Sequence, residues 1–232
     1  MTRILILNPN HSTACSDGID AAIAPFRHPG GPSLDVVTLA EGPPAIYSWR
    51  DWHAVVEPIC RRIEAEIAEV FVIACASDPG IEAARTATDR PVLGVFRCAV
   101  AAAVAQAERF GVIAIVEASK ARHLAALRAM GLEARLAAEV ALNVSMDSLL
   151  DGAAASESLI QAKLIQAARS CVASGAGTVI LGCTGMAHHR AAIEAACGVP
   201  VIEPCQAAVA LAIGHVLTGA RGLAPPRPPP RP

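Results

Sequence analysis

The sequence has few aromatic residues and no cluster of basic residues. Phe, Trp and Tyr make up 3% of its 232 residues, and the formal net charge at pH 7 is −2. Proteins that bind single-stranded nucleic acid stack bases on aromatic side chains, and proteins that bind duplexes or anionic membranes carry basic clusters. We therefore expect a small-molecule substrate, and neither nucleic acid nor a membrane, as the partner of this chain.

Long apolar segments are also missing. No stretch approaches the run of about 18 apolar residues that a membrane-spanning helix needs. The N-terminal sequence MTRILILNPNHS has only a short apolar run before Asn8, whereas a signal peptide has a longer apolar region and a cleavage site. The sequence therefore predicts a cytoplasmic protein.

The cysteines include no CxxC pair, which is the spacing of zinc knuckles and thioredoxin-type redox sites. In a cytoplasmic chain we expect reduced thiols, most of them acting as small apolar side chains. The eight cysteines are Cys15, Cys60, Cys75, Cys98, Cys171, Cys183, Cys197 and Cys205.

Short apolar segments alternate with longer Ala-rich segments. The segments typical of strands are 3–7, 34–39, 70–74, 91–96, 110–116, 142–145, 178–182 and 200–203. The segments typical of helices are 51–68, 80–88, 98–108, 119–130, 156–174, 187–197 and 205–219. Strands that are apolar throughout are typical of parallel sheets covered by helices on both faces, so the sequence predicts an α/β fold.

The two halves of the chain match at a constant spacing. Four strand segments of the first half fall on strand segments of the second half when shifted by 108 residues, to within one residue. We interpret this spacing as an internal duplication. It predicts two pseudosymmetric lobes, each with a mostly parallel sheet flanked by helices. Because parallel sheets bind ligands at the carboxyl ends of their strands, we expect the active site in the cleft between the lobes.

The duplication also suggests the domain boundaries. We assign residues 1–98 and 205–222 to lobe 1 and residues 99–204 to lobe 2. The remaining segment, 223–232, reads LAPPRPPPRP, and its prolines exclude a helix or a central strand because they lack backbone donors. We expect a flexible tail there, with a polyproline II docking segment as the alternative.

Two cysteines follow strand segments at positions that the duplication makes equivalent. Cys75 precedes Ser77 in CASDPG, and Cys183 precedes Thr184 and Gly185 in CTGM. Each loop leads into a segment that suits a helix start, so each cysteine is expected to face unpaired backbone N–H groups. Such a position favours thiolate over thiol, and we expect mildly lowered pKa values for both cysteines.

Two thiols on opposite sides of one carbon predict a two-base reaction. One thiolate removes a proton from a carbon next to a carbonyl, and the opposing thiol returns a proton to the other face. The carbon is inverted, and neither a metal nor an organic cofactor is required. The loop N–H groups, with the hydroxyls of Ser77 and Thr184, are expected to hold the enolate. A lone buried cysteine is more often a packing residue, so the pairing of Cys75 with Cys183 carries this hypothesis.

The first strand segment also ends in polar side chains. Asn8, Asn10 and Ser12 follow it within the sequence NPNHS. They either bind a polar ligand or cap the following turn. Their place at the carboxyl end of a strand favours the cleft, and we include Asn8 and Asn10 among the expected substrate contacts.

Two further segments need an interpretation. The sequence YSWRDWH (47–53) is either a lid over the cleft or a helix start that Trp52 pins to the core. His188 and His189 lie beyond the second cysteine loop, and we interpret them as helix-surface residues rather than catalytic ones.

Together, the loops resemble those of the aspartate/glutamate/hydantoin racemase superfamily, over residues 1–220. The motifs NPN, CASDPG and LGCTGM are most similar to the hydantoin racemase branch, whose members carry CxxDPG and GCxGM. The resemblance implies a cofactor-independent, homo-oligomeric racemase or epimerase that acts on a hydantoin-like compound. It implies Cys75 and Cys183 as the acid–base pair. The substrate contacts that it implies are Asn10, Ala76, Ser77, Thr184 and Gly185.

Two positions depart from the family pattern. Gly185 stands where glutamate racemases have His, which disfavours a plain amino-acid substrate. Ala114 and Ile115 stand where hydantoin racemases tend to carry a Thr–Thr pair, which leaves the substrate open. The alternatives are a maleate-type cis–trans isomerase, another cysteine-dependent lyase, an Asp/Glu racemase, and a binding or thiol-redox protein. Arylmalonate decarboxylases keep only the second cysteine, so Cys75 argues against that activity.

Overall fold

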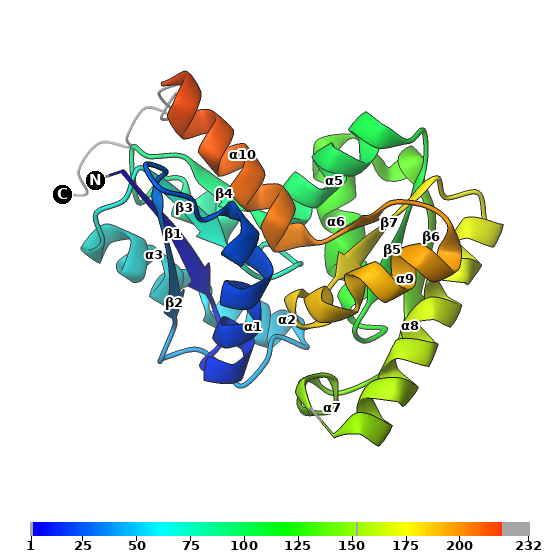
Figure 1. Cartoon of the computed structure of the whole chain (residues 1–232). Coiled ribbons are helices and arrows are strands. Elements are labelled where there is room, and N and C mark those ends of the chain that lie inside the picture. Colours follow the sequence, from blue (N-terminus) through cyan, green and yellow to red (C-terminus); the bar gives the residue numbers. More distant parts are fainter. Residues whose placement is uncertain (1, 152, 220–232) are drawn as a thin grey trace.

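Two four-stranded sheets organise the chain into lobes that lie side by side (Figure 1). The computed structural model describes residues 2–151 and 153–219. The strands are β1 (Arg3–Asn8), β2 (Ser33–Thr38), β3 (Val70–Ile73), β4 (Val92–Gly94), β5 (Phe110–Ala114), β6 (Leu136–Ala141), β7 (Thr178–Gly182) and β8 (Val201–Ile202). Their order is β2–β1–β3–β4 in one sheet and β6–β5–β7–β8 in the other, with all neighbours parallel. The predicted α/β fold with two parallel sheets is confirmed.

One strand breaks the predicted spacing of 108 residues. The prediction of a strand at 142–145 is wrong, because β6 begins at Leu136, five residues earlier than that spacing requires. Asn143 instead turns the chain, with a φ of 54°, and its Oδ1 accepts the backbone N–H of Glu117. The sequence of β6, LAAEVA, hid the strand because alanine has a low strand propensity and this edge strand is only partly buried.

The helices cover both faces of each sheet. They are α1 (Thr13–Ile23), α2 (Trp49–Ala54), α3 (Val56–Ala65), α4 (Ile81–Ala84), α5 (Val95–Gln106), α6 (Ser119–Met130), α7 (Met146–Leu150), α8 (Ala154–Ala173), α9 (Arg190–Cys197) and α10 (Pro204–Thr218). The short 3-10 helices are η1 (Ala24–Phe26), η2 (Glu133–Arg135) and η3 (Thr184–His189). Helix α1 was not predicted, although Ser12 caps its N-terminus and Cys15, Ile19 and Ile23 recur at helical spacing on its buried face.

Each sheet is covered by a helix that follows the last strand of the other sheet. Helix α10 follows β8 but returns to the first lobe, as its orange-to-red ribbon shows (Figure 1). There its buried face packs against Ile4, Ile6, Val70 and Val72. Helix α5 follows β4 but packs most of its buried face against Phe110, Val112 and Ile180 of the second sheet. The chain therefore crosses between the lobes twice, and the predicted boundary between residues 98 and 99 falls inside α5.

A buried carboxylate ties the loop after β3 to the start of α5. Asp78 Oδ1 accepts the backbone N–H of Phe96 and Oδ2 accepts that of Arg97, both at 2.9 Å. These are N–H groups that the first turn of a helix leaves unpaired. Burial raises the pKa of Asp78 to about 6, although both N–H groups and the charge of Arg97 oppose the shift. Gly94 is required beside this carboxyl, because a Cβ there would collide with it.

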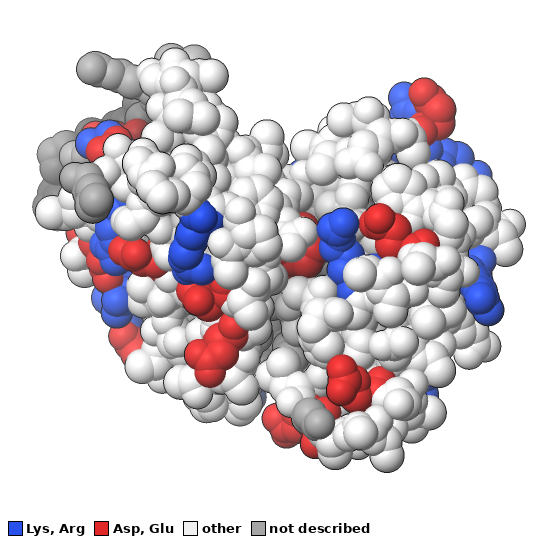
Figure 2. Space-filling model, viewed as in Figure 1, with Lys and Arg blue, Asp and Glu red and all other residues white. Residues whose placement is uncertain are grey.

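The face drawn in Figure 2 has no large patch of one charge among the described residues. Figure 2 shows basic (Lys, Arg) and acidic (Asp, Glu) side chains dispersed over this face. Among the helices of residues 2–151 and 153–219, none combines the length and the apolar character that crossing a membrane would demand. The predicted tail at 223–232 lies outside the described residues.

We expect Asp78→Ala to lower the free energy of unfolding by about 2–3 kcal/mol, because two helix N–H groups lose an ionised acceptor. Urea unfolding at pH 8, where Asp78 is ionised, measures the effect. Glu64→Ala, at an exposed position of α3, is the matched control. An unfolding midpoint that is the same in Asp78→Ala and in the unchanged protein would show that this carboxylate does not hold α5.

Candidate active site

Cys75 and Cys183 line one cavity between the two lobes. Cys75 follows Ala74 at the end of β3, and Cys183 follows directly after β7. The other residues around the cavity are Asn10, Ala45, Ile46, Tyr47, Ala74, Ala76, Ser77, Ile115, Ser119, Arg122, His123, Met146, Gly182 and Thr184. Its volume of about 40 Å³ leaves room for only a few water molecules.

The two cysteine loops hold their sulfur atoms in the same way. The residue two positions after each cysteine donates its backbone N–H to the sulfur, Ser77 to Cys75 and Gly185 to Cys183. Ser77 adds its hydroxyl, with Oγ 3.4 Å from Cys75 Sγ. The internal duplication therefore extends from the strands to the hydrogen bonds around the two thiols.

Burial changes the expected acidity of both thiols. It raises the pKa of Cys75 and the pKa of Cys183, so the expectation of lowered values is wrong. At Cys75 the hydrogen bonds from Ser77 and the charge of Arg122 oppose the effect of burial, while the charge of Asp78 adds to it. At Cys183 the neighbouring thiols of Cys15 and Cys75 and the carboxyl of Glu203 add to it, and the Gly185 N–H opposes it. Cys75 is therefore the thiol whose surroundings favour ionisation more.

Arg122, which was not among the predicted site residues, is a buried cation that lines the cavity. This residue of α6 is 3% exposed, and its Nη1 donates to the Tyr47 carbonyl at 3.1 Å. Its Nη2 donates to Ser119 Oγ at 3.2 Å, while its Nε is buried without a partner in the described part of the chain. Burial lowers the pKa of Arg122. A signal was present, because Ala126 lies one turn later on the same apolar face of the helix.

A second buried polar pair stands beside Arg122. His123 lines the cavity, and its Nδ1 lies 2.5 Å from Oε1 of Glu139 on β6. Both side chains are almost fully buried, and the His123 ring stacks on Phe96 with ring centroids 4.5 Å apart. Because β6 was not predicted as a strand, the pairing of these two residues was not predicted either.

The segment at 45–53 crosses from the first lobe to the wall of the cavity. Ser48 caps α2 in a capping box with Asp51, and Trp52 Nε1 donates to the Ser77 carbonyl at 3.0 Å. The predicted helix start pinned by Trp52 is therefore present. Tyr47 Oη accepts the backbone N–H of Met146 in the second lobe at 2.5 Å. The segment thus bridges the two lobes, while its role as a lid stays a prediction.

The structure brings most of the predicted site residues together. Asn10, Ala76, Ser77 and Thr184 line the cavity with both cysteines. Asn8 does not line it, because its side chain is fully buried beneath Asn10 and bonds to that residue and to Ser16. Its expected substrate contact is therefore not supported.

Gly185 also lies outside the cavity lining. A side chain there would meet Leu149 of α7, so the residue provides close packing and its N–H rather than a substrate contact. The two histidines further along differ from each other. His188 is exposed, but His189 is 2% exposed, and the interpretation of both as helix-surface residues is wrong for His189. Burial lowers the pKa of His189 to about 4.

The positions that depart from the family pattern form an apolar part of the site. Ala114 is fully buried at the end of β5, and Ile115 lines the cavity. Ile46 and Met146 line it as well. The cavity therefore has apolar side chains from both lobes besides its polar groups Asn10, Ser77, Thr184 and Arg122.

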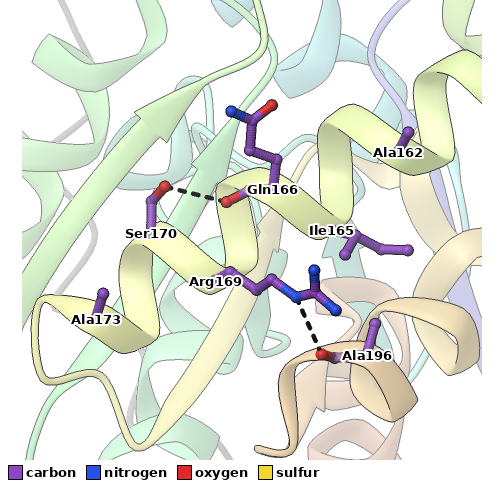
Figure 3. Close-up of a pocket in the computed structure, with 7 residues that line it drawn as sticks. All are labelled: Ala162, Ile165, Gln166, Arg169, Ser170, Ala173 and Ala196. Atoms are coloured by element: carbon purple, nitrogen blue, oxygen red, sulfur yellow. Dashed lines mark hydrogen bonds between the residues drawn. The ribbon is translucent and has the colours of Figure 1, made fainter.

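A second hollow lies on the outer surface of the second lobe, along α8 and the end of α9 (Figure 3). Two of its side chains bond to backbone carbonyls, Ser170 Oγ to that of Gln166 within α8 and Arg169 Nε to that of Ala196 in α9. The remaining lining consists of Ala162, Ile165 and Ala173. No acid, thiol or histidine is among these lining residues, so the hollow does not provide acid–base chemistry.

Comparisons with known proteins identify the family of the chain. The chain is 32% identical over 225 residues to hydantoin racemase of Paenarthrobacter aurescens, covering 94% of this chain and 92% of that protein. It is 30% identical over 213 residues to hydantoin racemase of Pseudomonas sp. (strain NS671), covering 90% and 84%. The structure of allantoin racemase from Klebsiella pneumoniae superposes with a TM-score of 0.87 at 28% identity, covering 96% of this chain and 91% of that one.

The family model described as Asp/Glu/Hydantoin racemase matches residues 4–212. The match includes both sheets and both cysteine loops. The chain therefore belongs to the Asp/Glu/hydantoin racemase family of isomerases.

Proposed function

We propose that this protein inverts a carbon next to a carbonyl in a hydantoin-like compound, with Cys75 and Cys183 as its acid and base. The observation that carries the proposal is the pair of equivalent thiols on one cavity. The curated relatives that bear the name hydantoin racemase support this substrate class.

The surroundings of the two thiols suggest their starting states. Cys75 has the Ser77 hydroxyl and the Arg122 charge nearby, so it is the thiolate that removes the proton. Cys183 has acidic neighbours and stays a thiol that donates its proton to the opposite face. For the opposite enantiomer the roles of the two sulfurs are exchanged.

Arg122 supplies positive charge where the reaction develops negative charge. Removing a proton next to a carbonyl moves charge onto the carbonyl oxygen. Arg122 is buried and fixed by the Tyr47 carbonyl and Ser119, and its Nε has no partner within the described residues. A preorganised donor in a buried cavity stabilises such an oxyanion more strongly than a donor in water does.

The lining of the cavity favours a neutral cyclic substrate over an α-amino acid. None of the described lining residues is acidic, so the ammonium group of an amino acid would be buried without a counter-charge. Asn10, Ser77 and Thr184 offer hydrogen bonds to ring carbonyl and N–H groups. Ile46, Ile115 and Met146 suit an apolar substituent on the inverted carbon.

Substrate entry requires the cavity to widen. A cavity of about 40 Å³ holds a few water molecules but no hydantoin ring. The bridge from Tyr47 to Met146 and the hydrogen bonds from Arg122 to the 45–47 segment close it. We propose that the 45–49 segment and α7 move apart to admit the substrate.

We expect Cys75→Ser and Cys183→Ser each to abolish racemisation of an enantiopure 5-substituted hydantoin, lowering the rate at least about 100-fold. Each variant keeps one base, so each should still exchange the α-proton of one enantiomer in D₂O, and the two variants should prefer opposite enantiomers. Polarimetry and proton NMR measure the two processes. The panel should include allantoin and glutamate.

Cys60→Ser on α3 is the matched control, because that thiol does not line the cavity. It should racemise at the rate of the unchanged protein. Wild-type rates in Cys75→Ser and Cys183→Ser would refute the two-base proposal, and turnover of glutamate alone would refute the substrate class.

We expect Arg122→Met to lower kcat/KM about 100-fold or more, because an oxyanion donor is lost. The same change removes the charge that lowers the Cys75 pKa, so the acidic limb of the kcat/KM profile should move to higher pH. Arg122→Lys should restore part of both effects, and Arg128→Met, at an exposed position of α6, should change neither. An acidic limb that stays in place in Arg122→Met would show that Arg122 does not tune the base.

Alkylation should distinguish the two thiols. Burial raises both pKa values, so we expect slow reaction with iodoacetamide at neutral pH and faster reaction as the pH rises. Cys75 should be modified before Cys183, because it is partly exposed and has Arg122 nearby. Peptide mass spectrometry over time measures the order. Faster labelling of Cys183 would reverse the assignment of base and acid.

A further inference from the structure

Three possible metal ligands meet outside the cysteine cavity. Glu157, His188 and His189 each offer one ligand atom, and these three atoms lie within 4.8 Å of one another. Glu157 belongs to the first turn of α8, and the two histidines end η3. None of the three lines the cavity that holds Cys75 and Cys183, so the proposed racemase reaction does not explain the cluster.

His189 is the unusual member of this cluster. It is 2% exposed, and its Nε2 is buried without a hydrogen-bond partner in the described part of the chain. Burying such a group without a partner is unfavourable, so buried imidazoles normally bond to a protein group, a water molecule or a metal. The His188 ring lies against it, with centroids 3.9 Å apart, which places two imidazoles side by side.

The other two members leave the cluster open to solvent. Glu157 and His188 are both exposed. Glu157 forms no ion pair with the residues described here, and the nearby Arg190 pairs with Glu194. The carboxylate therefore has no other cation assigned to it, and an ion from solution can reach the three ligands.

We propose that Glu157, His188 and His189 bind a zinc ion. Two imidazoles and one carboxylate are a ligand set that Zn²⁺ favours, and a water molecule can complete a tetrahedron. In such a tetrahedron the protein ligands are about 3.4 Å apart, given zinc–ligand bonds of about 2.0–2.1 Å. The three ligand atoms now lie within 4.8 Å of one another, and rotation of the exposed Glu157 and His188 side chains can bring them to this shorter distance.

The ion would restrain the loop that carries the second cysteine. η3 begins at Thr184, directly after Cys183, and ends at the two histidines. Zinc bound there fastens this segment to the start of α8. Gly185, within the same segment, packs against Leu149 of α7. The bound ion therefore stabilises the wall of the cavity without touching the reacting atoms.

Titration of the chelator-treated full-length protein with ZnCl₂ tests the site. We expect the protein to bind one equivalent of zinc with a micromolar or lower dissociation constant, measured by calorimetry, with the stoichiometry checked by elemental analysis. Bound zinc should also raise the thermal midpoint of unfolding. Glu157→Gln and His188→Asn should each weaken binding at least about tenfold and lose the thermal shift. Both positions are exposed, so both variants are expected to fold. Glu64→Gln and His28→Asn, at exposed positions elsewhere, are the matched controls.

Cobalt identifies the ligands, because the chain has eight thiols that also bind soft metals. Co²⁺ bound by the proposed nitrogen and oxygen ligands should show visible d–d absorption and no thiolate-to-cobalt charge-transfer band. A strong charge-transfer band, zinc binding unchanged in Glu157→Gln and His188→Asn, or no binding at micromolar zinc would each overturn the proposal. Because these readouts do not use turnover, they are independent of the racemase proposal.

Discussion

The exchange of α5 and α10 between the two sheets is the constraint on which the site depends. Each helix starts at the end of one sheet and buries its apolar face against the other sheet. The lobes therefore cannot separate without exposing apolar surface from both cores. This arrangement keeps the carboxyl ends of β3 and β7 close enough for Cys75 and Cys183 to line one cavity. Asp78 extends the constraint into the first cysteine loop, since its carboxylate holds the start of α5.

The two cysteine loops share their backbone hydrogen bonds, but the side chains around the two sulfur atoms differ. The same backbone N–H, two residues after each cysteine, bonds to each sulfur, as expected for lobes with a common origin. The side chains around the sulfurs differ, because the charges of Arg122 and Asp78 act in opposite directions on the pKa of Cys75, whereas Cys15, Cys75 and Glu203 all raise the pKa of Cys183. Burial raises the pKa of Glu203 to about 7, so this neighbour is only partly ionised near neutral pH. A symmetric backbone thus carries two thiols of different acidity.

The central strands and the two cysteine loops could be predicted from the sequence. Buried strands are continuous apolar runs, and the spacing between the two halves can be read from the sequence without the structure. The edge strand β6 could not, since its half-exposed, alanine-rich sequence lacks that signal. The direction of the thiol pKa values was also mistaken, because a helix-start loop suggests stabilisation of thiolate while the depth of burial depends on the tertiary structure. Arg122 was not predicted either, because Ala126 marks the apolar face of α6 but does not show which part of the other lobe covers that face.

The unequal acidity of the two thiols has a kinetic consequence under the proposed mechanism. Two enantiomers have equal free energies, so kcat/KM must be the same in both directions whatever the protein does. The free enzyme exists in two proton-transfer forms, one for each enantiomer, and the form with Cys75 ionised is the more populated. The enantiomer that needs the rarer form binds with a lower apparent affinity, and a proportionally higher kcat must offset it. The proton must also return between the sulfurs after each turnover, so this return limits the rate at abundant substrate whenever it is slower than the chemical steps.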